Sequence, residues 1–267
     1  MSSAALAPEL AGFTRREFAA DAAAWPVYWR GSGPGVVIIH EIPGITPAVA
    51  RFGRRLADAG FTAVLPSLFG TPGRRLGVGY AAGVAARLCV RREFHVLARR
   101  QSSEVVAPLR TLCRMVHAEC GGPGVGALGM CFTGNFALGL MLEPAVLAPV
   151  LSQPSLPFGL TGAQRAALHV SADELAAVKA RVAAGERVLG LRFTHDLACP
   201  PARFRTLRAE LGPGFEGIEI DSGPGNAHGI PRWAHSVLTN DLVDREGHPT
   251  RAALERVLTF LRERLQA

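Results

Sequence analysis

The sequence contains almost no lysine, because Lys179 is the only one among its 267 residues. Arginine therefore carries nearly all of the positive charge behind the formal net charge of +7 at pH 7. Its pairs, such as Arg54-Arg55 and Arg99-Arg100, are scattered along the chain. A nucleic-acid-binding surface more typically gathers its basic residues into one stripe with aromatic residues between them. We therefore expect no nucleic-acid partner.

Long apolar runs are also missing. No stretch of the chain reaches the roughly 18 to 20 apolar residues that a membrane-spanning helix needs. Residues 1–10 lack the basic start and the apolar core of a signal peptide. We therefore expect a cytoplasmic protein without a membrane partner.

Cysteine is scarce, and its spacing shows no pairing. The chain has an odd number of cysteines and no CxxC motif: Cys89, Cys113, Cys120, Cys131 and Cys199. In a chain of this length, that pattern argues against a disulfide framework and against a zinc ribbon. Histidine and aspartate do not cluster with the spacing of metal ligands either. We expect a reducing compartment, no metal and no organic cofactor.

The sequence does contain a regular alternation of strand and helix patterns. Apolar and β-branched runs predict strands at 36–40, 62–69, 124–128, 146–151, 188–193 and 215–220. Apolar periodicity and capping residues predict helices at 47–59, within 103–118, at 135–142, after Ser171, at 201–211 and at 250–265. This alternation predicts an α/β fold with a mostly parallel central sheet and helices on both faces.

The remaining segments fit around that sheet. Residues 1–30 are expected to supply two strands or a hairpin at a sheet edge. Residues 70–102 and 154–170 do not fit the alternation and are candidate lid or cap segments. No linker and no internal repeat interrupts the pattern, so we expect one domain over residues 1–267.

One stretch combines a strand, a sharp turn and a helix around a reactive side chain. The strand at 124–128 continues into Gly129-Met130-Cys131-Phe132-Thr133-Gly134. This is a relative of the Gly-x-Ser-x-Gly nucleophile elbow, with Thr133 at the second glycine position. Small residues let the backbone pass close to a strained nucleophile. The pattern predicts Cys131 as a nucleophile and the N–H of Phe132 as an oxyanion donor; the alternative is a buried structural cysteine.

A thiol nucleophile needs a base, and the base needs a carboxylate to orient it. Asp196 follows the strand at 188–193, and His228 lies in a glycine-rich loop after the strand at 215–220. Nucleophile, acid and histidine occur in this order at strand ends in α/β-hydrolases. We therefore predict that Asp196 and His228 complete a triad with Cys131.

Other readings of these residues stay open. His195 and His235 compete with His228 for the role of base. His235 follows Arg232-Trp233-Ala234 and is expected to lie in a helix, where a packing role would explain it. Asp196 could instead cap the next helix or turn.

Together these motifs resemble the dienelactone hydrolases, a family with the α/β-hydrolase fold. The resemblance covers about residues 36–265 of the chain. It rests on His40-Glu41-Ile42-Pro43-Gly44, on the Cys131 motif, on Asp196 before a proline-led helix, and on Ala227-His228-Gly229.

The resemblance implies roles for further residues. Glu41 would lie beside the Cys131 thiol and control when it becomes a thiolate, and the amides of Ile42 and Phe132 would form the oxyanion hole. The family arginine four residues after the catalytic histidine matches Arg232, a candidate anion-binding group for the substrate. A second substrate arginine stays open among three candidates: Arg87, Arg91 and Arg92.

The expected function is hydrolysis of carboxylic esters or lactones through a Cys-His-Asp triad and an acyl-thioester intermediate. One alternative is a promiscuous thiol hydrolase that also accepts activated phosphotriesters. Another is a hydrolase-like protein that binds a ligand without turnover. The expected partner is a small-molecule substrate, and the protein is expected to be a monomer or a small homo-oligomer.

Overall fold

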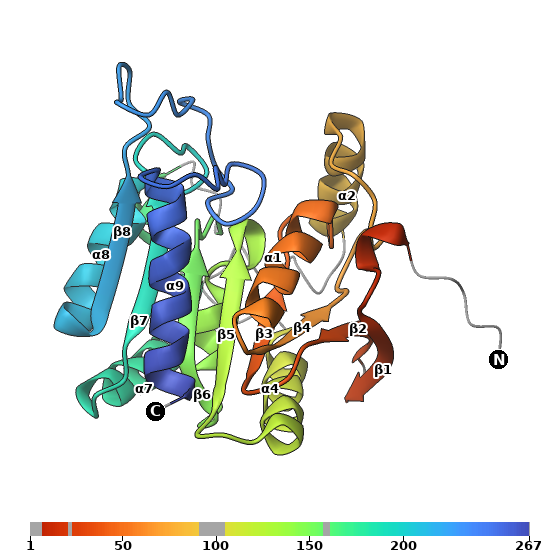
Figure 1. The fold of residues 1–267 in the computed structure, drawn as a ribbon. Coiled ribbons are helices and arrows are strands. Elements are labelled where there is room, and N and C mark those ends of the chain that lie inside the picture. The colour runs from red at the N-terminus through yellow and green to blue at the C-terminus, as the bar shows by residue number, and fades with distance from the viewer. Residues whose placement is uncertain (1–6, 21–22, 91–104, 157–160, 267) are drawn as a thin grey trace.

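A computed structural model describes residues 7–20, 23–90, 105–156 and 161–266. Its strands form one sheet in the order β1-β2-β4-β3-β5-β6-β7-β8 (Figure 1). Their bounds are β1 Thr14–Ala20, β2 Ala23–Arg30, β3 Gly35–Ile39, β4 Thr62–Pro66, β5 Val125–Met130, β6 Val146–Ser152, β7 Val188–Phe193 and β8 Phe215–Ile220. The first two strands pair antiparallel at one edge, and every pair from β4 to β8 is parallel.

Helices cover both faces of the sheet. Their bounds are α1 Pro47–Asp58, α2 Val78–Val90, α4 Val106–Cys120, α5 Phe136–Leu140, α6 Gly162–Ala166, α7 Ala172–Ala183, α8 Pro201–Leu211 and α9 Pro249–Leu265. Short 3-10 turns occupy Pro8–Leu10, Cys131–Thr133 and Gly212–Gly214. Helices α1 and α9 lie on one face, and α4, α7 and α8 lie on the other (Figure 1). Within the described part of the chain, no helix is both long and apolar enough to cross a membrane.

The central strand β3 is covered on both faces, which explains why its sequence is apolar at every position. Val36 and Ile38 belong to the core on the side of α1 and α9, whereas Val37 and Ile39 belong to the core on the side of α4. Successive side chains of a strand point to opposite faces, so a strand covered on both faces needs apolar residues at every position. Because β3, β5, β6 and β7 pair in parallel, their carboxyl ends lie at one edge of the sheet, where the candidate site lies.

The predicted fold class is confirmed. The strands at 188–193 and 215–220 and the helix at 201–211 have the predicted bounds. The strand predicted at 62–69 ends at Pro66, and the helix predicted at 135–142 is shorter, since α5 covers only Phe136–Leu140.

The candidate lid segments are only partly described. Helix α2 occupies much of 70–90, and its Val84 and Leu88 join the core cluster that contains Phe69 and Phe132. Residues 91–104, with the candidates Arg91 and Arg92, and residues 157–160 lie outside the described residues.

Candidate active site

The chain turns sharply at Cys131, directly after β5. Cys131 has a φ of 54°, in the left-handed region that residues other than glycine rarely adopt. A Cβ added at Gly129 would lie 2.2 Å from the Thr133 carbonyl oxygen, and one at Gly134 would lie 2.5 Å from the Cα of Pro154. The strained, close-packed turn predicted from the sequence is therefore present, with a partly exposed Cys131 at its apex.

Thr133 occupies the second glycine position of the elbow, and its side chain makes hydrogen bonds that glycine could not make. Its side chain is fully buried. The hydroxyl accepts from the Met130 N–H at 3.1 Å and donates to the Ile39 carbonyl at 2.8 Å. Thr133 therefore ties the elbow to the end of β3, from which the loop with Glu41 and Ile42 departs.

Thr133→Val is expected to lower the free energy of unfolding by about 1–3 kcal/mol, because the buried Met130 N–H loses its hydroxyl partner while the side-chain shape is kept. Thr133→Ser keeps the hydroxyl and should stay within about 1 kcal/mol of wild type. Urea unfolding of the three proteins measures the difference. A Val variant as stable as wild type, or a Ser variant as unstable as the Val variant, would show that the hydroxyl has no such role.

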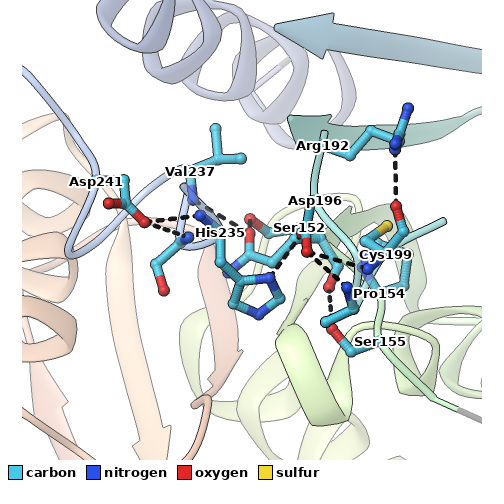
Figure 2. Close-up of polar contacts among 12 residues, drawn as sticks. Ser152, Pro154, Ser155, Arg192, Asp196, Cys199, His235, Val237 and Asp241 are labelled. Carbon is cyan, nitrogen blue, oxygen red and sulfur yellow. Dashed lines mark hydrogen bonds and ion pairs between the residues drawn. The ribbon is translucent and has the colours of Figure 1, made fainter. Parts of the chain in front are cut away.

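Asp196 and His235 form a pair at the candidate site. The His235 Nδ1 lies 2.6 Å from Asp196 Oδ2 (Figure 2). The other oxygen, Oδ1, accepts from the backbone N–H groups of Ala198 and Cys199 at 2.9 and 3.2 Å. One oxygen of Asp196 therefore caps the turn that follows it, as the alternative interpretation predicted. The other oxygen orients the imidazole of His235.

Cys131 completes the cluster on the far side of the imidazole. Its sulfur lies close enough to the His235 side chain to raise the pKa of that imidazole, and because Asp196 takes Nδ1, the nitrogen left for the thiol is Nε2. Burial by itself would lower the pKa of His235, but the Cys131 sulfur and the Asp196 carboxylate outweigh it and raise that pKa well above its ordinary value.

The prediction that His228 pairs with Asp196 is wrong. His228 is exposed in the loop after β8, and its ring centre lies 5.3 Å from that of His248. The other competitor, His195, has its Nδ1 3.1 Å from the Thr194 hydroxyl. Of the three histidines weighed from the sequence, the structure brings His235 to Asp196 and Cys131.

The helix expected at His235 is also wrong, since residues 231–241 form turns and irregular segments. The carboxylate of Asp241 accepts from the backbone N–H groups of His235 and Ser236, both at 2.8 Å (Figure 2). A side chain that satisfies these N–H groups replaces the helical carbonyls that would otherwise do so. Asp241 is the sequence feature that indicates a turn here, but it does not show which histidine reaches Asp196.

Arg192 braces the loop that carries Asp196. This arginine is buried on β7. Its Nε donates to the Cys199 carbonyl at 3.0 Å and its Nη2 to the Thr194 carbonyl at 2.9 Å, so one guanidinium holds both ends of the loop (Figure 2 shows the first contact). Glu219 pairs with the same guanidinium and compensates its charge. Sequence reasoning did not identify this residue.

Glu41 is buried and lies in a network of hydrogen bonds. Its carboxylate accepts from four side chains, of which all but the last belong to the loop after His235: Ser236, Thr239, Asn240 and Gln153. The Ser236 contact measures 2.7 Å. Burial raises the pKa of Glu41, and the hydroxyl donors partly offset this. None of the four donors is the Cys131 thiol. The Glu41 carboxylate is therefore hydrogen-bonded mainly to the loop that follows His235.

The two residues predicted to supply oxyanion amides leave neighbouring strands. Ile42 follows β3 and Phe132 follows β5, and these strands pair in parallel with Ile39 opposite Gly129. The loops therefore start side by side at the same edge of the sheet.

Arg232 is exposed and borders a pocket of about 670 Å³ that reaches Asp196 and His235. Arg165, Leu197 and Trp233 line the same pocket. Arg232 was matched to the family arginine because it lies four residues after His228. Four residues after His235 the chain has Thr239 instead, and its hydroxyl donates to Glu41. Arg87 is exposed on the rim of a second pocket beside α2.

No group of three or more metal-binding side chains converges anywhere in the part of the chain that the structure describes. The groups that could take part in a reaction at this site are the Cys131 thiol, the His235 imidazole beside it and the Asp196 carboxylate bound to that imidazole.

The fold is that of an α/β-hydrolase. The dienelactone hydrolase family model matches residues 22–168, more than half of the chain, and the protein belongs to this family. The matched region includes Glu41 and Cys131 but ends before Asp196 and His235. A comparison with curated proteins found no match.

Solved structures of similar fold include hydrolases of several kinds. A Klebsiella pneumoniae protein assigned as a dienelactone hydrolase has a TM-score of 0.60 at 16% identity, covering 93% of this chain and 98% of its own. The dienelactone hydrolase-like promiscuous phosphotriesterase P91, from metagenomic libraries, has a TM-score of 0.58 at 16% identity, covering 95% and 99%. Esterase 2 of Thermogutta terrifontis, phosphoramylated by tabun, has a TM-score of 0.60 at 15% identity, covering 96% of both chains. These likenesses show the shared fold, and family membership with esterase neighbours supports a hydrolase.

Proposed function

We propose that this hydrolase cleaves carboxylic esters or lactones through a Cys131–His235–Asp196 triad. The observation that carries the proposal is the placement of Cys131, on a strained turn and beside a histidine whose Nδ1 lies 2.6 Å from a buried aspartate. A nucleophile, a base in contact with it and a carboxylate that orients the base are the parts that nucleophilic catalysis requires.

The reaction follows from these parts. His235 takes the thiol proton, and the Cys131 thiolate attacks the carbonyl carbon of the ester. The N–H groups of Ile42 and Phe132 stabilise the oxyanion, an effect worth about 3–4 kcal/mol per donor in enzymes where a donor was removed. His235 protonates the departing alcohol, which leaves an acyl thioester on Cys131. Water that His235 deprotonates then releases the acid and restores the thiol.

Glu41 acts in this scheme through the base. Its hydrogen bonds to Ser236, Thr239 and Asn240 join the end of β3 to the loop that carries His235. We assign it a positioning role, in which it keeps the imidazole over the sulfur. Arg232 and Arg165, on the pocket beside the triad, are the candidate groups for an anionic part of the substrate.

Mass spectrometry of the protein mixed with p-nitrophenyl acetate tests the proposal. We expect one acetyl group on the peptide that contains Cys131 and none on that peptide in Cys131→Ala. Cys120→Ala is a matched control, because Cys120 is a partly exposed thiol at the end of α4, outside the site. Absence of the adduct together with absence of turnover would favour the ligand-binding alternative.

A second candidate activity is cleavage of activated phosphotriesters. It is suggested by two proteins of the same fold, P91, described as a promiscuous phosphotriesterase, and a Thermogutta terrifontis esterase phosphoramylated by tabun. In this chain Cys131 would attack phosphorus and expel the aryl alcohol. Parallel assays of an aryl acetate and an aryl diethyl phosphate separate the two activities. Release of the aryl alcohol from the acetate alone would leave the protein an esterase.

A further inference from the structure

His40 is a fully buried histidine that the catalytic scheme does not use. It is the first residue after β3 and has no exposed surface. One ring nitrogen, Nδ1, lies 3.1 Å from the Glu41 carbonyl oxygen, and the other, Nε2, lies 3.1 Å from the Leu68 backbone nitrogen. Both ring nitrogens of this buried histidine are therefore hydrogen-bonded, and both partners are backbone groups.

The Leu68 contact decides the tautomer of His40. A backbone N–H can only donate, so Nε2 must be the unprotonated nitrogen that accepts from Leu68. The proton of the neutral ring then lies on Nδ1 and is donated to the Glu41 carbonyl. Burial lowers the pKa of His40 to about 4, which keeps the ring neutral and this pattern intact at neutral pH.

The Glu41 carbonyl belongs to the same peptide group as the Ile42 N–H. This peptide is trans, and in a planar trans peptide the C=O and N–H point in opposite directions. A donor that holds the oxygen therefore also sets the direction of the N–H. The Gly44 N–H donates to the same oxygen at 2.8 Å, so two donors hold this carbonyl.

We propose that His40 is a positioning residue that aims the Ile42 N–H into the oxyanion hole by holding the Glu41 carbonyl from behind. The inference rests on the proposed function, because it needs Ile42 as an oxyanion donor. Hydrogen bonding to the carbonyl also polarises the peptide, which makes its N–H a stronger donor.

The surroundings of His40 link it to the second oxyanion residue. The Phe69 ring meets the His40 ring edge to face, with centres 4.5 Å apart, and its centre lies 6.0 Å from that of Phe132. The His40 ring is thus held by Leu68 on its Nε2 side and by Phe69 across its plane. These contacts restrict rotation of the ring. The Nδ1–H is therefore a donor in a fixed position for the carbonyl of the peptide between Glu41 and Ile42.

Two substitutions separate the two bonds of His40. His40→Asn can place an amide N–H near the Nδ1 position and keep the bond to Glu41, while it loses the bond to Leu68. His40→Gln can place an amide oxygen near the Nε2 position and keep the bond to Leu68, while it loses the bond to Glu41. Both variants are buried, polar and smaller than histidine, so each controls for the cavity in the other.

The measurements are kcat/KM for p-nitrophenyl acetate and the rate of Cys131 alkylation by iodoacetamide, both on protein whose circular dichroism matches that of wild type so that misfolded protein does not count. Alkylation displaces iodide from a saturated carbon and forms no oxyanion, so it reports the thiolate without the hole. We expect His40→Gln to lose about 10²-fold in kcat/KM, the size of effect that a displaced catalytic group produces. Its alkylation rate should stay at the wild-type level. His40→Asn should keep ester turnover within about fivefold of wild type.

A trifluoromethyl ketone provides a second readout. The Cys131 thiolate adds to its carbonyl carbon and the carbonyl oxygen becomes an oxyanion in the hole. Its affinity should fall in His40→Gln by the same factor as kcat/KM. Equal losses in the Asn and Gln variants, or loss of alkylation in parallel with ester turnover, would overturn the role assigned to His40. Failure of wild type itself to acylate Cys131 would instead overturn the proposed function, so the two failures are distinguishable.

Discussion

Cys131→Ala is expected to lower kcat/KM for an aryl ester by about 10⁵ to 10⁶-fold, the loss seen when the nucleophile of a triad enzyme is removed. Cys131 is the side chain at the apex of the strained turn and lies beside His235, whose pKa it raises. Alanine removes the attacking atom but adds no bulk and leaves the backbone turn intact. Steady-state release of p-nitrophenol measures the loss, and the circular dichroism and unfolding midpoint should remain close to wild type.

The control variants sharpen this result. Cys120→Ala should keep full activity, because Cys120 belongs to the end of α4 and not to the site. Cys131→Ser should be far weaker than wild type, since a hydroxyl has a much higher pKa than a thiol and His235 is placed to draw a thiol proton. Full activity in Cys131→Ala would overturn the whole assignment.

His235→Ala is expected to cost about as much as loss of the nucleophile, on the order of 10⁵ to 10⁶-fold in kcat, because members of a triad act as a unit. Without the imidazole, the thiol has no base in contact and the departing alcohol has no acid. The Asp196 carboxylate would also lose the partner that lies 2.6 Å from it.

His228→Ala is the matched control for His235. His228 is exposed and lies beside His248, outside the cluster around Cys131. We expect its substitution to change kcat/KM by less than about twofold, as is usual for surface residues away from the site. If His228→Ala abolished turnover and His235→Ala preserved it, the base would be the histidine that the sequence pattern favoured.

The architecture was predictable because its signals are local. The buried strand β3 needs an apolar residue at every position, and helix α8 begins at a proline and ends before Gly212. The elbow is likewise written in consecutive residues, since Gly129 and Gly134 leave room for backbone and carbonyl groups that any side chain would strike. Cys131 and Asp196 could be selected from their positions directly after strands, and the structure brings them to one cluster.

The base was decided by tertiary contacts. His228 and His235 both follow β8, and no local pattern distinguishes which of them reaches Asp196, which is 39 residues away from His235 in the chain. The choice depends on how the loop folds, and Asp241 folds it by binding two backbone N–H groups.

Glu41 shows the same limit. Its position at the end of β3 was readable from the sequence, but its hydrogen-bond partners were not. Ser236 and Thr239 lie 195 and 198 residues away in the chain and come to Glu41 only when the strand ends meet at one edge of the sheet. Strand and helix patterns are set by neighbours in sequence, whereas the pairing of buried polar groups is set by whichever donors the finished fold brings within reach of an otherwise unsatisfied carboxylate.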